Sequence, residues 1–264
     1  MFIEKEFYMN SLKRGRKVII YVPDDYLTSN KRYPVIYIND GQNAFFDESS
    51  YIGVSWGFYE YANAINLDVI MVAIPCNFDL YKREDEYGPW LINKEILKLE
   101  YGDENLLIGG EGDAYLQFII EQLKEYIDNN FPTIKDDTAM VGSSMGGIIS
   151  SYAGIKYGHI FKKIASLSTA YWFYITEFCE LIEQSDLSEL ECFYLDLGDN
   201  EGNGADNISA LYNESNTIIY EKLVNKSDKI IGRYFENADH NEVQWRKRVP
   251  IFMNLFYQHG ESNV

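Results

Sequence analysis

The sequence has few cysteines, few histidines and few basic residues for its length. It carries three cysteines and three histidines among 264 residues, and its 23 lysines and arginines stand against 41 aspartates and glutamates. The cysteines are odd in number and lack the spacing of a metal site, so a reduced, cytoplasmic setting fits best. The formal charge of −18 leaves no basic surface for phosphates, which excludes nucleic acid as a partner.

Long apolar runs are also missing from the chain. None approaches the roughly 18–20 residues that span a bilayer, and residues 1–8 mix charged and apolar side chains like an edge strand rather than a signal peptide. We therefore expect no membrane association. A hydrophobic content of 46% excludes intrinsic disorder, and the length suits a single α/β domain over residues 1–264. The pattern does not specify an oligomeric state.

Segments typical of strands and helices alternate along the chain. We expect strands at 17–22, 33–38, 69–75, 138–141, 161–167, 192–198 and 230–235, and helices at 56–64, 113–129, 206–223 and 242–256. The first two of these strands flank a turn-rich segment and predict a hairpin, and Asp113 is a candidate N-cap. Residues 76–112 read as a long loop of the kind that often carries function. The alternation predicts a mostly parallel central sheet with helices on both faces.

A G-x-S-x-G pentapeptide at residues 142–146 is the most informative motif. The apolar run 138–141 precedes it, and small and apolar residues able to open a helix follow it. In this strand–turn–helix context the motif is typical of a nucleophile elbow, which holds Ser144 at the apex of a sharp turn. Gly142 and Gly146 permit the turn because Cβ atoms there would collide with neighbouring atoms. The motif predicts a catalytic serine, and a structural turn is the alternative.

A serine nucleophile needs a base, and the three histidines are the candidates. His159 follows the helix after the elbow and is typical of a surface turn, while His259 belongs to the last six residues. His240 lies in a polar loop after the expected strand 230–235. A hydrolase of this topology carries its histidine on that loop, so His240 is the predicted base.

The triad acid should lie between the serine and the histidine in the sequence. The segment 192–198 reads as a strand closed by glycine, and a loop with two carboxylates follows it. Asp196 lies inside the strand and is interpreted as a buried structural carboxylate. Asp199 and Glu201 can both reach an imidazole, and their spacing does not choose between them.

Five segments in order resemble the esterase D-like family of α/β-hydrolases, which includes trilactone siderophore, feruloyl and acetyl esterases. The blocks cover nearly the whole chain, and they are 38–45 (INDGQNAF), 83–90 (REDEYGPW), 109–113 (GGEGD), 141–147 around the elbow and 240–246 (HNEVQWR). The resemblance implies an α/β-hydrolase fold and a serine carboxylic-ester hydrolase that forms an acyl-enzyme. It also implies a small or medium soluble ester as substrate, with no metal or cofactor. An acyltransferase with the same triad and a non-catalytic hydrolase-fold binding protein are the alternatives.

The resemblance also assigns roles to individual residues. It makes Ser144 the nucleophile, His240 the base and Glu201 the acid, at a position where the family often has aspartate. It places the second oxyanion donor at the backbone N–H of Gln42. That group would join the N–H of Met145, which opens the helix after the elbow, where free N–H groups favour anions.

Four residues are candidate substrate contacts. Arg83, Tyr87 and Trp90 belong to the matched segment in the long loop, and Trp172 follows the strand expected at 161–167. Arg83 has a structural alternative, in which it forms a salt bridge with Glu86 and braces the loop. Trp172 has one as well, since it could cap the core instead of stacking on the substrate.

Overall fold

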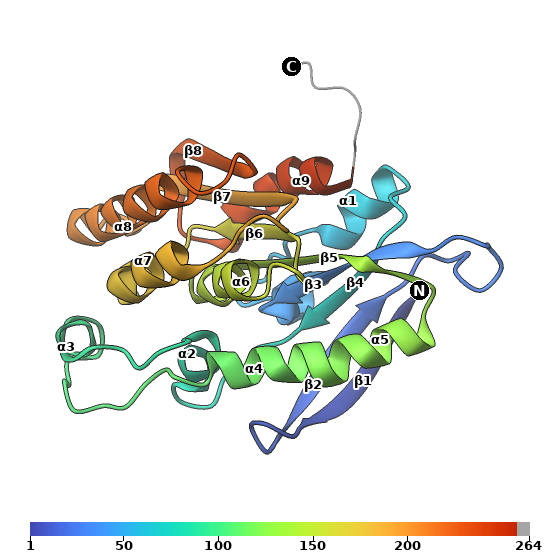
Figure 1. Cartoon of the computed structure of the whole chain (residues 1–264), viewed down its shortest axis with the longest axis horizontal. Coiled ribbons are helices and arrows are strands. Elements are labelled where there is room, and N and C mark those ends of the chain that lie inside the picture. The colour runs from blue at the N-terminus through green and yellow to red at the C-terminus, as the bar shows by residue number, and fades with distance from the viewer. Residues whose placement is uncertain (258–264) are drawn as a thin grey trace.

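The computed structural model describes residues 1–257 and places an eight-stranded sheet at their centre (Figure 1). The strand order is β1-β2-β4-β3-β5-β6-β7-β8. Strands β3 to β8 are mutually parallel, whereas β2 is antiparallel to both β1 and β4. The strands are β1 Phe2–Met9, β2 Arg14–Tyr21, β3 Tyr33–Asn39, β4 Ile70–Ile74, β5 Thr133–Ser143, β6 Lys163–Leu167, β7 Cys192–Asn200 and β8 Ile230–Asp239. This confirms the mostly parallel sheet.

Helices cover both faces of the sheet, as the alternating pattern predicted (Figure 1). Helices α1 and α9 pack on one face, and α4, α6, α7 and α8 pack on the other. A π-helical segment, Ile119–Lys124, joins α4 to α5. The helices are α1 Phe58–Ala64, α2 Lys82–Tyr87, α3 Lys94–Tyr101, α4 Gly112–Phe118, α5 Glu125–Asn130, α6 Met145–Lys156, α7 Ile175–Gln184, α8 Asp206–Val224 and α9 Glu242–Tyr257.

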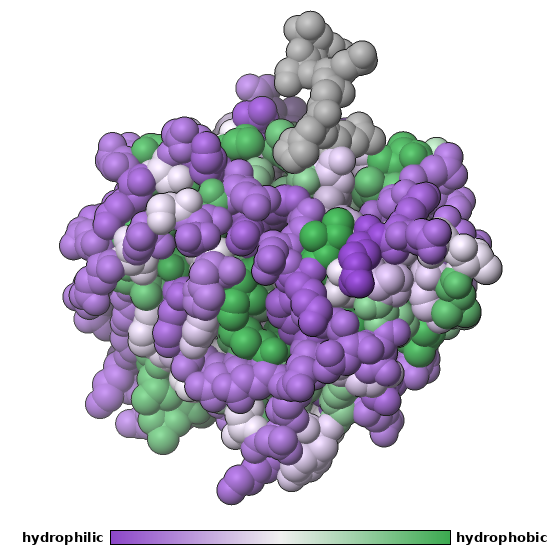
Figure 2. Space-filling view, turned by 45° about the vertical axis from the view of Figure 1, so that its right-hand side comes forward, coloured by the Kyte–Doolittle hydropathy of each residue, from purple (hydrophilic) through white to green (hydrophobic). Residues whose placement is uncertain are grey.

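The continuous apolar character of the central strands follows from burial on both sides. In β3, Val35 and Tyr37 enter the core beneath α4 and α6, while Ile36 and Ile38 enter the core beneath α1 and α9. Successive side chains of a strand point to opposite faces, so a strand covered on both sides needs apolar residues at every position. Within residues 1–257, no helix combines the length and apolarity needed to cross a membrane, and hydrophilic residues cover most of the face in Figure 2.

The predicted hairpin between 17–22 and 33–38 is wrong. Strand β2 pairs with β1 and β4, and β3 lies between β4 and β5. The turn-rich segment between β2 and β3 therefore carries the chain past the position that β4 later occupies. The hairpin that does form joins β1 to β2, and β1 is the edge strand expected at the N-terminus.

Two other local predictions need correction. The long loop 76–112 contains the short helices α2 and α3. Asp113 does not cap the next helix, which begins at Gly112. Its carboxylate instead accepts hydrogen bonds from Lys156 Nζ at 2.6 Å and from the Tyr157 hydroxyl at 2.7 Å. Both partners lie at the end of the helix that follows the elbow, so Asp113 ties that helix to α4.

A buried carboxylate fastens the 76–112 segment to the sheet. Glu86 of α2 has no exposed surface and accepts hydrogen bonds from Arg16 Nη2 at 2.7 and 2.6 Å. Arg14 Nε lies 3.3 Å from the same carboxylate. Burial raises the pKa of Glu86, and the two guanidinium groups oppose that rise. The position of α2 therefore depends on charges that strand β2 supplies.

We predict that Glu86→Gln destabilises the protein by about 3 kcal/mol, because it leaves the buried Arg16 without its counter-charge. Chemical denaturation measures this loss. Glu4→Gln is the matched control, since it breaks only an exposed pair with Lys17 and should change the unfolding free energy little. Equal unfolding free energies for the two variants would contradict the anchoring role of Glu86.

Candidate active site

The carboxyl ends of four parallel strands bring the predicted site residues to one edge of the sheet. Gln42 follows β3, Ser144 follows β5, Glu201 follows β7 and His240 follows β8. Ligands of open α/β sheets bind at this edge. A cleft of about 550 Å³ opens there, and its lining residues are Asp40, Gln42, Asn43, Tyr51, Ile52, Cys76, Phe78, Arg83, Glu84, Ser143, Ser144, Asn203, His240, Asn241, Glu242 and Trp245.

Ser144 sits at a sharp turn between β5 and α6. Its φ of 55° and ψ of −120° lie outside the regions that L-residues normally occupy. A Cβ atom on Gly142 would come within 2.2 Å of the Gly146 carbonyl oxygen, so this turn requires glycine. Met145 is the first residue of α6, and its N–H has no partner within the helix. The segment thus has the strand–turn–helix geometry that the motif predicted.

Three of the eight non-glycine residues with positive φ among residues 1–257 lie at the same edge of the sheet. Asp40, Ser144 and Ser168 follow β3, β5 and β6, and their φ angles are 52°, 55° and 44°. Non-glycine residues with such angles typically cost about 1–3 kcal/mol each and cluster at functional sites. Three of them on adjacent strands mark this edge as the functional one.

His240 and Glu201 are in direct contact. The His240 Nδ1 atom lies 2.6 Å from Glu201 Oε2. A proton on Nδ1 would be held by this carboxylate, which leaves Nε2 as the free base. Ser144 and His240 line the same cleft, and within residues 1–257 their side chains form no hydrogen bond with each other. Such bonds are often long in proteins without a bound substrate.

The second oxygen of Glu201 is held by hydrogen bonds that the sequence did not predict. Glu201 Oε1 accepts the Ser168 hydroxyl at 2.7 Å and also accepts the backbone N–H of Gly198. The Ser168 oxygen in turn accepts Trp245 Nε1 at 3.0 Å and Arg248 Nη1 at 2.9 Å. Glu201 is therefore held at both oxygens and has little freedom to turn away from His240.

Arg248 continues this network to Asp196, which is buried as expected. The Arg248 Nη1 atom donates to Asp196 Oδ1 at 2.7 Å, and the Tyr194 hydroxyl donates to Asp196 Oδ2 at 2.8 Å. Burial raises the pKa of Asp196 to about 6, and the Arg248 guanidinium opposes that rise. The pair joins β7 to α9 beneath the Glu201–His240 contact.

Asp199, the alternative acid, bonds to backbone rather than to the imidazole. Its carboxylate accepts the N–H groups of Asn237 at 2.9 Å and Ala238 at 3.1 Å. These bonds lower the pKa of Asp199. Asp199 thus holds the end of β8, which leads to His240, and Glu201 is the carboxylate that contacts the ring.

The Gln42 loop is held from several sides. The Gln42 carbonyl accepts the Ser49 hydroxyl at 2.7 Å, and its side-chain Oε1 accepts the Cys76 N–H at 3.0 Å. A Cβ atom on Gly41 would lie 2.2 Å from the backbone nitrogen of Ile74, so glycine permits the close approach to β4. These contacts fix the backbone N–H of Gln42 in position.

The predicted Arg83–Glu86 pair is wrong. Arg83 instead forms two bonds of 2.8 Å to the buried carboxylate of Asp40, one from Nε and one from Nη2. Glu86 instead forms ion pairs with Arg14 and Arg16 of β2. The neighbouring Tyr87 is fully buried, and its hydroxyl oxygen accepts the Asp40 N–H at 2.8 Å. Both side chains brace the Gln42 loop, and Arg83 also lines the cleft.

The two tryptophans expected at the substrate lie in packed layers outside the cleft lining. Trp90 packs edge-on against Tyr152 and Phe178, each with ring centroids 5.3 Å away. Trp172 is buried against Phe173, 4.1 Å between centroids. Five of the residues that do line the cleft lie outside the segments matched in the sequence, and they are Tyr51, Ile52, Cys76, Phe78 and Asn203.

Of the other two histidines, His159 is exposed after α6, where a turn residue was expected, and His259 lies outside the described residues.

The fold and site together define an α/β hydrolase, and comparisons with known proteins agree. The family model described as Putative esterase matches residues 9–251, so the chain belongs to this esterase family and is a carboxylic ester hydrolase. The chain is 25% identical over 256 residues to a Bacillus subtilis protein named uncharacterized protein YbbA, covering 95% of this chain and 96% of YbbA.

Solved structures with the same fold are similar over nearly the whole chain. An IroE-like serine hydrolase from Shewanella oneidensis has a TM-score of 0.75 at 20% identity, with 97% of this chain and 80% of that chain covered. A siderophore hydrolase, EstA from Aspergillus nidulans, has a TM-score of 0.74 at 15% identity, with coverage of 97% and 94%. These likenesses confirm the α/β-hydrolase fold.

We predict that Glu201→Gln lowers kcat by about two orders of magnitude or more, because an amide stabilises the imidazolium poorly and permits the wrong tautomer. Asp199→Asn should keep kcat and lower only thermal stability, since its contacts are to backbone. Steady-state kinetics on a neutral ester, with thermal denaturation of each variant, measures both effects. Loss of turnover in Asp199→Asn, with Glu201→Gln fully active, would exchange the two roles.

Proposed function

We propose that the protein is a serine esterase in which Ser144, His240 and Glu201 form a catalytic triad and the ester passes through an acyl-enzyme. The observation that carries this proposal is the 2.6 Å contact between His240 Nδ1 and Glu201, on a cleft that the strained Ser144 also lines. Membership of the esterase family supports ester hydrolysis as the reaction class.

In the proposed first step, Ser144 Oγ attacks the ester carbonyl while His240 Nε2 takes the hydroxyl proton. The tetrahedral intermediate then collapses, the C–O bond to the alcohol breaks, and the imidazolium returns its proton to the leaving alkoxide. The product alcohol departs and Ser144 remains acylated. Throughout, the Glu201 carboxylate stabilises the positive charge on the ring.

In the second step, water attacks the acyl-enzyme and His240 accepts its proton. Collapse of the second intermediate releases the carboxylic acid and regenerates the Ser144 hydroxyl. Both intermediates carry a negative oxygen, and the backbone N–H groups of Met145 and Gln42 are the proposed donors to it. Removing one such donor typically costs about 3–4 kcal/mol of transition-state stabilisation.

The cleft volume of about 550 Å³ suits a small or medium soluble ester as the substrate. Water is the proposed acceptor of the acyl group. Product analysis with added alcohol tests this choice, since an acyltransferase would form a new ester instead of the free acid. The cytoplasmic location proposed from the three cysteines is tested by cell fractionation.

We predict that Ser144→Ala lowers kcat by about four orders of magnitude or more with the fold intact, because the nucleophile is lost. A fluorophosphonate probe followed by peptide mass spectrometry should label Ser144 in the wild type and leave this variant unlabelled. Labelling of Ser143, or full turnover by Ser144→Ala, would overturn the assignment.

His240→Ala should lose turnover to a comparable extent, because no other group would accept the serine proton. His159→Ala is the matched control, since that ring is exposed outside the cleft and its loss should leave kcat/KM unchanged. Steady-state kinetics on the same neutral ester compares the two. An inactive His159→Ala together with an active His240→Ala would refute the proposed triad.

A further inference from the structure

The fixed charges of the cleft do not balance. Arg83 is the single lysine or arginine among its described lining residues, and Asp40 neutralises it through two hydrogen bonds. Two other lining carboxylates, Glu84 and Glu242, form no ion pair within residues 1–257. The cleft therefore presents two carboxylates without counter-charges.

Glu242 is the more unusual of the two. Its exposed fraction is 6%, it lines the cleft, and its hydrogen-bond partner from another residue is the Asn43 side-chain amide, 3.5 Å from Oε1. Burial raises the pKa of Glu242, with a further contribution from Asp40, while His240 and Arg83 lower it. A buried carboxylate without a cation is costly, and a cation bound in the cleft would remove that cost.

Aromatic side chains line the same cleft. Tyr51 and Phe78 are 76% and 63% exposed, although aromatic rings of this size are usually covered, and Trp245 contributes a third ring. Faces of aromatic rings attract ammonium groups, and carboxylates beside them add Coulombic attraction. Exposed rings and unpaired carboxylates are thus two independent features with the same ligand preference.

We propose that this cleft selects esters that carry an ammonium group, which Glu84, Glu242 and the rings of Tyr51, Phe78 and Trp245 bind next to Ser144. The proposal rests on the proposed function, since it assigns a substrate class to the same site. Neutral esters of similar shape are poorer substrates, and anionic esters are the poorest.

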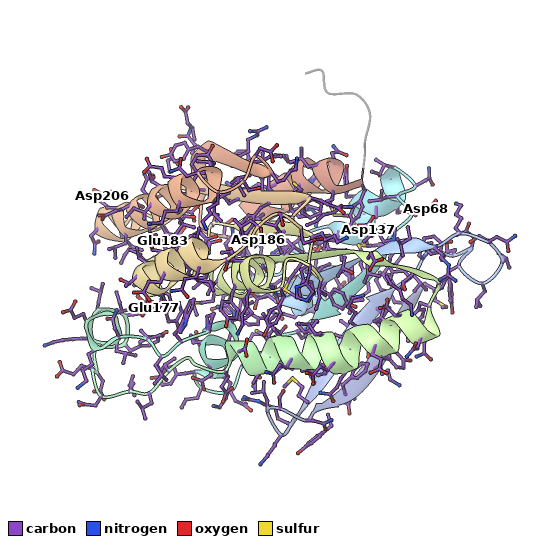
Figure 3. The ribbon with its side chains drawn as sticks, viewed as in Figure 1. Asp68, Asp137, Glu177, Glu183, Asp186 and Asp206 are labelled. Atoms are coloured by element: carbon purple, nitrogen blue, oxygen red, sulfur yellow. The ribbon has the colours of Figure 1, made fainter. Side chains whose placement is uncertain are left out.

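The proposed selectivity comes from groups in the cleft. It is distinct from the general attraction that a protein with a net charge of −18 exerts on any cation. Many of its carboxylates lie away from the cleft, and six of them are labelled in Figure 3. None of those six lines the cleft: Asp68, Asp137, Glu177, Glu183, Asp186 and Asp206. A peripheral carboxylate therefore provides a control for the general field.

The test compares kcat/KM for esters of matched chain length whose end group is cationic, neutral or anionic. One series places the charge in the acyl group, as p-nitrophenyl esters of trimethylammoniobutanoate, its neutral tert-butyl isostere and glutarate. A second series places it in the alcohol, as acetates of choline, its tert-butyl isostere and hydroxypropionate. In at least one series we expect the cationic ester to exceed the neutral one by about tenfold, and about 0.5 M salt to reduce this ratio.

Three variants locate the effect. Glu84→Gln and Glu242→Gln should each lower the cationic-to-neutral ratio by about threefold or more. Glu183→Gln removes the same charge from α7 and breaks only an exposed pair with Lys222, so its ratio should equal that of the wild type. Because each ratio is measured within one protein, a general loss of activity in a variant does not affect it.

Equal kcat/KM for cationic and neutral esters in both series would overturn the inference and leave the esterase proposal standing. Absence of Ser144-dependent hydrolysis of every ester would instead overturn the proposed function. In that case calorimetric titration with benzyltrimethylammonium decides the inference: binding that Glu242→Gln weakens supports the cation site, and no binding by the wild type refutes it.

Discussion

The position of the Glu201 carboxylate is the constraint on which the rest of the site depends. One of its oxygens contacts His240 Nδ1, and the other accepts the Ser168 hydroxyl and the Gly198 N–H. A carboxylate fixed at both oxygens can orient an imidazole, whereas a carboxylate on a free loop would exchange its partner for water. Burial of Glu201 favours this arrangement, since the hydrogen bonds there face little competition from solvent.

The support of Glu201 extends through the fold. Ser168 follows β6, Arg248 belongs to α9 and Asp196 belongs to β7, and hydrogen bonds connect them in series. The same principle operates on the other side of the cleft, where the carboxylate of Asp40 holds Arg83 and fixes the start of the Gln42 loop. In both arrangements, a buried carboxylate lies next to a strand end whose backbone is strained. Charge-assisted hydrogen bonds to the carboxylate offset the cost of that strain.

Local pattern was sufficient to predict most of the strands and helices and to single out Ser144 and His240, because strand ends and glycine turns leave a signature within a few residues. It left Asp199 and Glu201 open as the acid, and only the resemblance to the esterase family favoured Glu201. Contacts between residues that are far apart in the sequence left no such signature. Arg83 and Asp40 are 43 positions apart, and the expected pair with Glu86 failed because Arg16, from a strand 70 positions earlier, occupies that carboxylate. The failed hairpin has the same origin, since the strand that separates β2 from β3 is β4, which comes later in the sequence.

Substrate preference is the property that relatives predict least. Solved structures at 15–20% identity share the fold of this chain, with TM-scores near 0.75. The cleft wall, in contrast, includes Tyr51 and Phe78 from the loops after β3 and β4 and Glu84 from α2, and none of these three side chains belongs to the buried core. Such positions can change without loss of stability, and they decide which charges meet the ester. The substrate of this chain is therefore to be inferred from its own loop residues, and their unpaired carboxylates and exposed rings favour a cation.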